Sequence, residues 1–472
     1  MSSLLRCLFL LLLVLPLAAC DDAPRFTQAE PGEAMGGGTS TVNKHDKNAF
    51  SMASANLTAS RQLDFSVGNS FFRNPWVIAP STTTARDGLG PLFNTNACQN
   101  CHIRDGRGHP PGPDAKSAAS MLVRLSIPNA TEYLPVIERL GVVPEPAYGG
   151  QLQDMAVPGV APEGKVRVEY TPHSVTFTDG TTVELRKPKL LISQLGYGPM
   201  HPDTRFSARV APPMIGLGLL EAIPEEAILA NADPYDSNGD GIRGHVNQVW
   251  DDAQGKTVMG RFGWKAGQPN LNQQNVHAFS GDMGLTTRLR PIDDCTPTQT
   301  DCLNARQDRG EPEVSDNILR LMLFYTRNLA VPARKDVDSP QVLAGKNLFF
   351  EAGCQRCHIP TFTTSANAAE PEQANQVIRP YTDLLLHDMG PDLADDRSEF
   401  AAGGRDWRTA PLWGIGMTET VSGHTQFLHD GRARNLLEAV LWHGGEAKAA
   451  QQHVLTFNAE QRAALLAFLN SL

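Results

Sequence analysis

After its first nineteen residues, the sequence of 472 residues has no apolar run of membrane length, which excludes further membrane-spanning helices. It also has no basic run, and its 41 Lys and Arg residues are outnumbered by 51 Asp and Glu residues, so we expect no nucleic-acid partner. Strand-like alternation is sparse, whereas helical periodicity is clear. These features together predict a mainly α fold.

Cysteine is scarce, with eight residues, but two copies of Cys-x-x-Cys-His account for half of them. Such a motif is typical of covalent c-type haem attachment, in which the thiols bind the haem vinyl groups and the histidine becomes the proximal iron ligand. A zinc knuckle would require paired Cys/His sites at close spacing, and a thiol redox pair needs no following histidine. We therefore predict two c-type haems, haem 1 on Cys98, Cys101 and His102, and haem 2 on Cys354, Cys357 and His358.

The first nineteen residues have the features of a secretory leader, with Arg6 followed by an apolar run too short for a confident membrane span. Residues 17–20, LAAC, resemble the bacterial lipoprotein signal, so Cys20 is predicted to carry lipid. The alternative is an ordinary leader cut nearby. Asp21 resembles an inner-membrane retention signal. These features predict a lipid anchor on the periplasmic side, most simply at the inner membrane, and residues 20–59, rich in Gly, Ser and Thr, as a flexible tether.

Apart from Cys7, which lies in the leader, the remaining cysteines are Cys295 and Cys302, in a loop rich in Pro, Thr and Asp. In an exported protein such a pair predicts a local disulfide. The closed loop is small, so its contribution to stability is expected to be modest.

Helical patterns flank the second haem motif. They cover residues 341–350 before it and 459–469 at the end of the chain, which is how class I cytochrome c domains are built. Residues 340–472 are therefore predicted to form one such domain. A further helix is expected over 317–325, capped by Ser315 or Asp316. Residues 60–331 hold the first haem and are too long for a bare cytochrome, so we expect enlargement by loops and short β-hairpins, such as 166–170 with 181–185. The two motifs also share a phenylalanine five residues earlier, Phe93 and Phe349, which favours duplicated haem domains.

Several further segments resemble the bacterial di-haem cytochrome c peroxidases, and specifically their di-haem oxidoreductase branch. They are GLGPLF (88–93), APPMIGLGLLEAIP (211–224), GRFGWKA (260–266), LHDMG (386–390), TAPLWG (409–414) and FLHDG (427–431). The resemblance covers nearly the whole chain after the leader. It implies two cytochrome c-like domains and an oxidoreductase, and it specifies the family more closely than the reaction.

The resemblance implies that Glu221 acts as the acid–base catalyst over the open face of haem 1, because a glutamate in a Pro-rich apolar segment does so in the peroxidases. A carboxylate in apolar surroundings has a raised pKa that suits this task. Glu221→Gln is then expected to abolish turnover. The alternative is a helix-capping or salt-bridged glutamate. Arg209 is a second candidate, either polarising peroxide or pairing with a haem propionate, and its alternative is a surface ion pair.

His443 is the predicted distal ligand of haem 2, because it occupies the position that is methionine in the peroxidases. A His/His haem has a lower reduction potential than a His/Met haem. Rival ligands are His387, Met389 and Met417. For the distal side of haem 1 the sequence leaves the choice open between His201, His277 and no ligand; no ligand is the simplest arrangement for a site that binds peroxide.

The segment DSNGDGI resembles the start of a calcium loop, with Asp236, Asn238 and Asp240 as oxygen ligands and Ile242 offering its carbonyl. Position 12 is Asn247 and not the bidentate glutamate of such loops. The alternative is a tight Asn-Gly/Asp-Gly turn. Related peroxidases hold calcium between their haems, which favours a calcium site here.

The resemblance favours a peroxidase that reduces hydrogen peroxide with electrons from a small periplasmic cytochrome or cupredoxin. One alternative is a di-haem oxidase or oxygenase that acts on a protein or organic substrate through high-valent haem, and His443 favours it. Another is a non-catalytic electron-transfer cytochrome, against which the length of residues 60–331 argues. Many relatives are homodimers, so dimerisation is left open.

Overall fold

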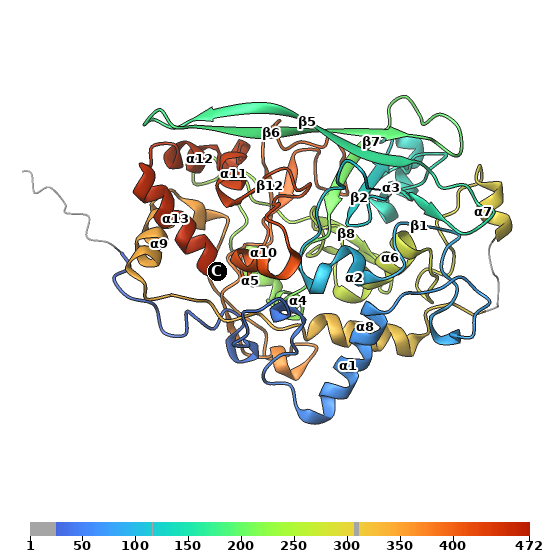
Figure 1. The fold of residues 1–472 in the computed structure, drawn as a ribbon, viewed down its shortest axis with the longest axis horizontal. Coiled ribbons are helices and arrows are strands. Elements are labelled where there is room, and N and C mark those ends of the chain that lie inside the picture. The colour runs from blue at the N-terminus through green and yellow to red at the C-terminus, as the bar shows by residue number, and fades with distance from the viewer. Residues whose placement is uncertain (1–24, 116, 306–310) are drawn as a thin grey trace, which may run out of the picture.

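The computed structural model describes residues 25–115, 117–305 and 311–472 (Figure 1). The predicted leader and Cys20 lie outside these residues. The helices are α1 (Ala59–Arg73), α2 (Cys98–Cys101), α3 (Leu134–Leu140), α4 (Leu217–Glu221), α5 (Glu225–Leu229), α6 (Leu271–Met283), α7 (Thr300–Ala305), α8 (Asp316–Arg327), α9 (Pro340–Glu351), α10 (Thr418–Ser422), α11 (Leu436–Leu441), α12 (Lys448–Val454) and α13 (Ala459–Ser471). Within the described residues, no helix combines the length and apolar character needed to cross a membrane.

The prediction of a mainly α fold is wrong, because the chain is 31% helical and 17% strand, with several small sheets. The strands are β1 (Leu92–Phe93), β2 (Met121–Ser126), β3 (Gln151–Leu152), β4 (Met155–Ala156), β5 (Lys165–Thr176), β6 (Thr182–Ser193), β7 (Arg205–Val210), β8 (Gln248–Asp251), β9 (Lys256–Met259), β10 (Phe362–Thr363), β11 (Val377–Ile378), β12 (Leu386–Asp388) and β13 (Asp406–Arg408). Most of these strands are too short for alternation to be visible in the sequence.

The inserted strands lie mainly in the first half of the chain. β2 pairs with β3 and β7 in one three-stranded antiparallel sheet. β5 pairs with β6 in a hairpin whose two strands have twelve residues each. In Figure 1 this hairpin runs along the top of the molecule toward α11 and α12. At its turn Thr178 donates a backbone hydrogen bond to Leu455, and His173 stacks on Trp442 with ring centroids 5.5 Å apart. The enlargement of the first half therefore packs on the second.

One hydrophobic core runs through both predicted domains. Leu125 and Val210 from the first half belong to the same buried cluster as Phe349 and Phe468 from the second. Such continuity means that the halves share an apolar interior and stabilise one another.

Each haem motif is associated with a pair of crossing helices. α1 crosses α8 and α9 crosses α13, and a glycine lies at each close approach. A Cβ atom on Gly68 would lie 2.3 Å from the carbonyl oxygen of Leu321, and one on Gly345 would lie 1.9 Å from that of Ala464. The second pair is the arrangement predicted for 340–472. The first pair shows that the same packing is present beside haem 1.

Gly345→Ala is expected to destabilise the protein by about 2 kcal/mol, because the added methyl group forces α9 away from α13. The melting temperature, followed by circular dichroism, should fall by several degrees. Gly112→Ala is the matched control, since a Cβ atom there meets nothing within 4 Å. An equal melting temperature for both variants would contradict the predicted close packing.

Residues 25–58 do not form the flexible tether that the sequence predicted. They pack along both halves: Ser51 donates a hydrogen bond to Asp105, and Phe26 contacts Phe350 with ring centroids 4.8 Å apart. Glu33 is buried and pairs with Arg334 at 2.8 Å and with Lys346 at 2.9 Å. The small residues of this segment permit close contacts, and the buried charges fix it in place.

Candidate functional site

The haem 1 motif occupies the short helix α2 and the turn that follows it. His102 is half-buried, and its Nδ1 lies 2.7 Å from the backbone carbonyl oxygen of Pro212. A carbonyl only accepts hydrogen bonds, so Nδ1 carries the proton and Nε2 is left with its lone pair. Burial lowers the pKa of His102 to about 4, which keeps the imidazole neutral. This is the state required of a proximal iron ligand.

The haem 2 motif repeats this arrangement. Nδ1 of His358 donates to the carbonyl of Tyr381 at 2.8 Å, and burial lowers the pKa of His358 to about 4. All four thiols of the two motifs are free of disulfides, as attachment to haem requires. Each motif thus presents two thiols and one histidine nitrogen.

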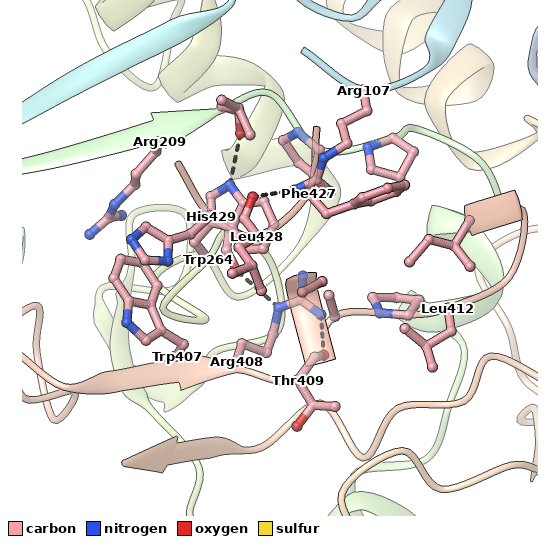
Figure 2. Close-up of a pocket in the computed structure, with 18 of the residues that line it drawn as sticks. Arg107, Arg209, Trp264, Trp407, Arg408, Thr409, Leu412, Phe427, Leu428 and His429 are labelled. Carbon is pink, nitrogen blue, oxygen red and sulfur yellow. Dashed lines mark hydrogen bonds between the residues drawn. The ribbon is translucent and has the colours of Figure 1, made fainter. Parts of the chain in front are cut away.

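A single cavity of about 600 Å³ connects the two motifs, and its lining includes the cysteines and histidines of both. Cofactor sites usually measure roughly 300–1,000 Å³. Figure 2 shows part of the lining, where Arg107, Arg209 and Arg408 surround a group of aromatic and apolar side chains. Cationic groups around an apolar cavity suit a cofactor with an apolar ring and carboxylate arms.

Two arginines of the cavity wall, Arg107, which is buried, and Arg408, which is half-buried, test whether this chain fits haem. Arg107 donates to the carbonyls of Gln426 and Leu428, and Arg408 donates to those of Gly263 and Thr409. Among the described residues, no carboxylate lies within ion-pair distance of either guanidinium. Burial lowers the pKa of both to about 10. Asp430 acts on Arg107 and Asp383 acts on Arg408 from beyond ion-pair distance, so both guanidiniums remain without a paired carboxylate and fit the propionates of bound haem.

The helices α6 and α11 approach the cavity in the same register. Each follows an asparagine, Asn270 or Asn435, whose side chain accepts a hydrogen bond from the backbone three residues later. The first, fourth, fifth and eighth residues after each asparagine line the cavity. They are Leu271, Gln274, Asn275 and Ala278 for α6, and Leu436, Ala439, Val440 and His443 for α11. The eighth position is therefore His443 after Asn435 and Ala278, with only a methyl side chain, after Asn270.

Each helix faces a different haem motif. Burial and the charge of Asp282, at the end of α6, raise the pKa of Cys98 to about 12. Burial lowers the pKa of His358, and the charge of His443, just after α11, lowers it further. α6 therefore borders the haem 1 motif, and α11 borders the haem 2 motif.

His443, the predicted distal ligand of haem 2, lines the cavity. Its Nδ1 donates to the carbonyl of Ala439 at 2.7 Å, which leaves Nε2 for a metal, and burial lowers its pKa. Met389 also lines the cavity, whereas Met417 does not and packs in another apolar cluster. The geometry supports His443 among these candidates.

The rival His387 has both ring nitrogens occupied. Nε2 lies 2.9 Å from Asp383 and Nδ1 lies 2.7 Å from Glu446. Although burial opposes it, the hydrogen bonds to these groups and to the Cys357 sulfur raise the pKa of His387 well above its usual value. Cys357, Asp383 and His387 are the one group of metal-ligand type that comes together in the described residues. As a doubly paired imidazolium, His387 is not free to bind iron.

The two histidines considered for the distal side of haem 1 are also engaged. His277 lies in the cavity wall, but its Nε2 is 3.0 Å from Asp252 and its Nδ1 is 3.0 Å from Gln268. His201 does not line the cavity and accepts a hydrogen bond from Asp203. The geometry thus favours an open position at haem 1.

Glu221 lies outside the cavity lining, although its neighbour Leu220 belongs to it. One oxygen accepts a hydrogen bond from the Leu271 backbone at 2.9 Å, and the other pairs with Arg327 at 2.6 Å. The prediction that Glu221 stands over haem 1 is therefore not supported by its position. Its carboxylate instead fixes the start of α6, which is the salt-bridged alternative.

Glu221→Gln is now expected to keep turnover within about tenfold of the wild type, because the amide oxygen can still accept from Leu271. Loss of the ion pair to Arg327 should cost about 1 kcal/mol and lower the melting temperature by a few degrees. Steady-state peroxide consumption and thermal unfolding measure the two effects. An unchanged melting temperature with a 100-fold loss of turnover would instead support acid–base catalysis.

Arg209 does reach the cavity. It pairs with Glu399 at 2.8 Å and donates to Ser207 at 2.9 Å. Its guanidinium also lies 5.9 Å from the ring of Trp407, which stacks on His429 with ring centroids 3.7 Å apart (Figure 2). Arg209 therefore belongs to a charged and aromatic wall of the cavity and makes no simple surface ion pair.

The remaining predicted residues are the disulfide pair, of which Cys302 lies in α7, and the predicted calcium loop. Cys295 and Cys302 form a disulfide with Cα atoms 5.8 Å apart. In the predicted calcium loop, Asp236 accepts from Gly241, Asn238 from Asp240 and Asp240 from Ile242. The other oxygen of Asp240 lies 3.7 Å from Arg356 of the haem 2 motif. The loop thus borders the entrance to the haem 2 side of the cavity.

Sequence reasoning missed Ala278, Arg107, Arg408, Trp407 and His429. A comparison of the two segments after Asn270 and Asn435 would have found Ala278, because both asparagines precede a cavity-lining helix. The burial of Arg107 and Arg408 and the stacking of Trp407 have no local signal, since they depend on residues far away in the chain.

The sequence that forms this cavity and its two haem motifs matches the model of a protein family. The family model described as "Di-haem oxidoreductase, putative peroxidase" matches residues 29–472, so the chain belongs to the di-haem oxidoreductases. It is an oxidoreductase that uses haem. No curated protein matches the sequence. A solved structure of hydrazine synthase from Kuenenia stuttgartiensis, pressurised with xenon, aligns with 56% of this chain and with 73% of the hydrazine synthase chain. The sequence identity is 13% and the TM-score is 0.29.

Proposed function

We propose that this protein reduces hydrogen peroxide to water at haem 1 with electrons that enter through haem 2. Two electrons and two protons convert one peroxide to two water molecules. The observation that carries the proposal is the pair Ala278 and His443, each the eighth residue after the asparagine that precedes α6 or α11, with Ala278 on α6 and His443 just beyond the end of α11. A methyl group leaves the iron position open for a substrate, whereas a histidine closes it.

The residues of the chain have separate tasks in this proposal. The thiols of each motif hold a covalently attached haem, and Pro212 and Tyr381 orient the two proximal histidines. Haem iron, when bound, supplies the electrons and the coordination position for peroxide. On α6, Gln274 and Asn275 flank Ala278 in the cavity wall, where their amides offer hydrogen bonds to a small polar substrate.

Arg107 and Arg408 bind the haem carboxylates and so keep the two cofactors in fixed positions. Arg209 adds a third cation to the same cavity wall, but Glu399 already compensates its charge. This distribution favours Arg107 and Arg408 as the propionate partners and leaves Arg209 as a residue that stabilises the wall.

One spectroscopic experiment tests the proposal. The reduced holoprotein is mixed with hydrogen peroxide while absorbance reports spin state and an electrode reports peroxide. We expect one high-spin haem, and rapid peroxide consumption that continues when a reduced small cytochrome or cupredoxin is supplied. Two low-spin haems that leave peroxide untouched would contradict the proposal and support an electron carrier.

The second candidate is an oxidase that takes electrons from an organic or protein substrate, and His443 in place of methionine favours it. A lower potential at haem 2 makes that site a poorer acceptor from high-potential donor proteins. Peroxide consumption that depends on an organic co-substrate and stays unaffected by donor protein would favour the oxidase over the peroxidase.

We also propose that the protein is anchored by lipid on Cys20 at the periplasmic side and that donor proteins dock from the same compartment. A further proposal is that Asp236, Asn238, Asp240 and the Ile242 carbonyl bind calcium. The oxygen-rich sequence supports the calcium site, whereas the Arg356 guanidinium beside Asp240 competes with a cation for that carboxylate. Calcium titration by calorimetry checks it, with Asp240→Asn expected to weaken binding at least tenfold. Mass spectrometry of the exported protein checks the lipid on Cys20.

A further inference from the structure

The two helix crossings place equivalent residues beside the two proximal histidines. A phenylalanine follows each crossing glycine by four positions, Phe72 after Gly68 and Phe349 after Gly345. A Cβ atom on Gly68 would contact Tyr325 of α8, and one on Gly345 would contact Phe468 of α13. Tyr325 and Phe468 are therefore structural counterparts. Phe72, and not Phe93, is the counterpart of Phe349, because the insertion before haem 1 separates α1 from its motif.

The aromatic contacts are nearly the same in both halves. The ring of Phe72 lies 6.1 Å from His102 and 5.3 Å from Tyr325. In the second half, the ring of Phe349 lies 6.3 Å from His358 and 5.2 Å from Phe468. A phenylalanine thus satisfies this packing beside haem 2. The hydroxyl of Tyr325 is an addition that the helix crossing itself does not need.

That hydroxyl donates to a buried carboxylate. Tyr325 OH lies 2.6 Å from Oδ1 of Asp105, and Ser51 donates to Oδ2. Tyr325 is 0% exposed and Asp105 is 1% exposed. Arg73 is the cation near both groups. The phenol therefore has one well-placed proton acceptor and no contact with solvent.

We propose that Tyr325 is a redox-active residue that gives one electron to haem 1 after hydrogen peroxide has oxidised that site. This inference rests on the proposed peroxidase function. In the step, the phenolic O–H bond breaks, the proton passes to Asp105, and the electron passes past Phe72 to haem 1. A neutral phenoxyl radical remains on Tyr325, and haem 1 is reduced by one electron. An electron arriving from haem 2 later restores the phenol, with the proton returning from Asp105.

Three features favour this step. A phenol that loses an electron becomes a strong acid, so an acceptor at 2.6 Å removes its proton without any movement of the chain. The negative charge of the carboxylate favours electron loss from its neighbour. Tyr325 also does not line the cavity, so a radical there is kept away from substrate.

Tyr381 provides the matched contrast within the same molecule. It is also buried and close to a haem motif, since its carbonyl accepts from His358. Its hydroxyl, however, lies 3.5 Å from the Arg334 guanidinium, which donates toward it. A cation opposes electron loss and offers no proton acceptor. Tyr381 is thus expected to remain reduced.

The experiment uses the holoprotein, mixed with hydrogen peroxide and freeze-quenched for electron paramagnetic resonance. We expect the resonance signal of a tyrosyl radical in the wild type. This signal should become narrower when the protein is grown with ring-deuterated tyrosine. The signal should fall at least tenfold in Tyr325→Phe, which copies the arrangement at Phe468. It should fall similarly in Asp105→Asn, because an amide is a poor proton acceptor and asparagine tolerates the φ of 62° found at this position. Tyr381→Phe should retain it.

Peroxide consumption is recorded on the same samples, which separates this inference from the proposed function. Consumption by the wild type with no tyrosyl radical, or a radical that persists in Tyr325→Phe, overturns the redox role of Tyr325 alone. No peroxide consumption by the wild type overturns the proposed function and this inference with it. The deuterium test on the wild type decides whether the radical is on tyrosine even where a variant folds poorly.

Discussion

Ala278→His is expected to convert haem 1 into a second closed haem and to stop peroxide turnover. Ala278 occupies the position on α6 that His443 occupies after α11, so an imidazole there reaches the iron position from the same side. An intramolecular ligand that binds with about 3 kcal/mol reduces the open fraction roughly 100-fold. The spectrum should change from one high-spin haem to two low-spin haems, and peroxide consumption should fall by a similar factor.

Ala278→Leu is the control for this variant, because it adds bulk of comparable size but no nitrogen ligand. Its haem 1 should stay high-spin, even though access for peroxide is reduced. A high-spin haem 1 in Ala278→His would show that α6 does not cover the iron. The proposed division between a reaction haem and an electron-transfer haem would then lose its main support.

Removal of the His443 imidazole should have the second largest effect, this time at haem 2. His443→Ala is expected to make haem 2 high-spin and to slow electron entry, because the iron loses a ligand whose ring is held by the Ala439 carbonyl. His443→Met should keep a low-spin haem with a potential higher by on the order of 0.1 V. For one electron, such a rise changes the equilibrium about fifty-fold.

Redox titration with optical detection measures both variants, and turnover with a reduced donor protein shows the consequence. His387→Gln is the comparison, since both of its ring nitrogens are bound by carboxylates. It should leave the spin state of haem 2 unchanged. A low-spin haem 2 that survives in His443→Ala and is lost in His387→Gln would assign the ligand to His387.

The sequence predicted what depends on nearby residues. The haem motifs and the Cys295–Cys302 disulfide are local, and α8 was found because its apolar periodicity is strong. α9 and α13 have weak apolar periodicity, and they were expected from their places before the haem 2 motif and at the end of the chain. The capping role of Ser315 on α8 was also readable. The extent of strand was underestimated, because twelve-residue β5 and β6 contain Pro172 and Pro188 and present polar residues to solvent.

The errors at the site have a different origin. Glu221 lies in an apolar segment, but its partner Arg327 is 106 residues away and places the carboxylate outside the cavity. The absence of a ligand at Ala278 is seen only when the segments after Asn270 and Asn435 are compared position by position. The segment 25–58 has the composition of a linker, and its order comes from Arg334 and Lys346, far along the chain.

The contacts of Glu33 have a consequence for how the protein is assembled. Glu33 and Lys346 are 313 positions apart, and both side chains are almost completely buried. A nascent chain that emerges from its amino end cannot satisfy Glu33 until α9 has been made, and burying that carboxylate without its cations would be costly. The segment that carries Glu33 is therefore expected to dock only after α9 has been made, whatever the order in which the rest of the chain folds. The contact makes attachment of the amino-terminal segment a late step of folding.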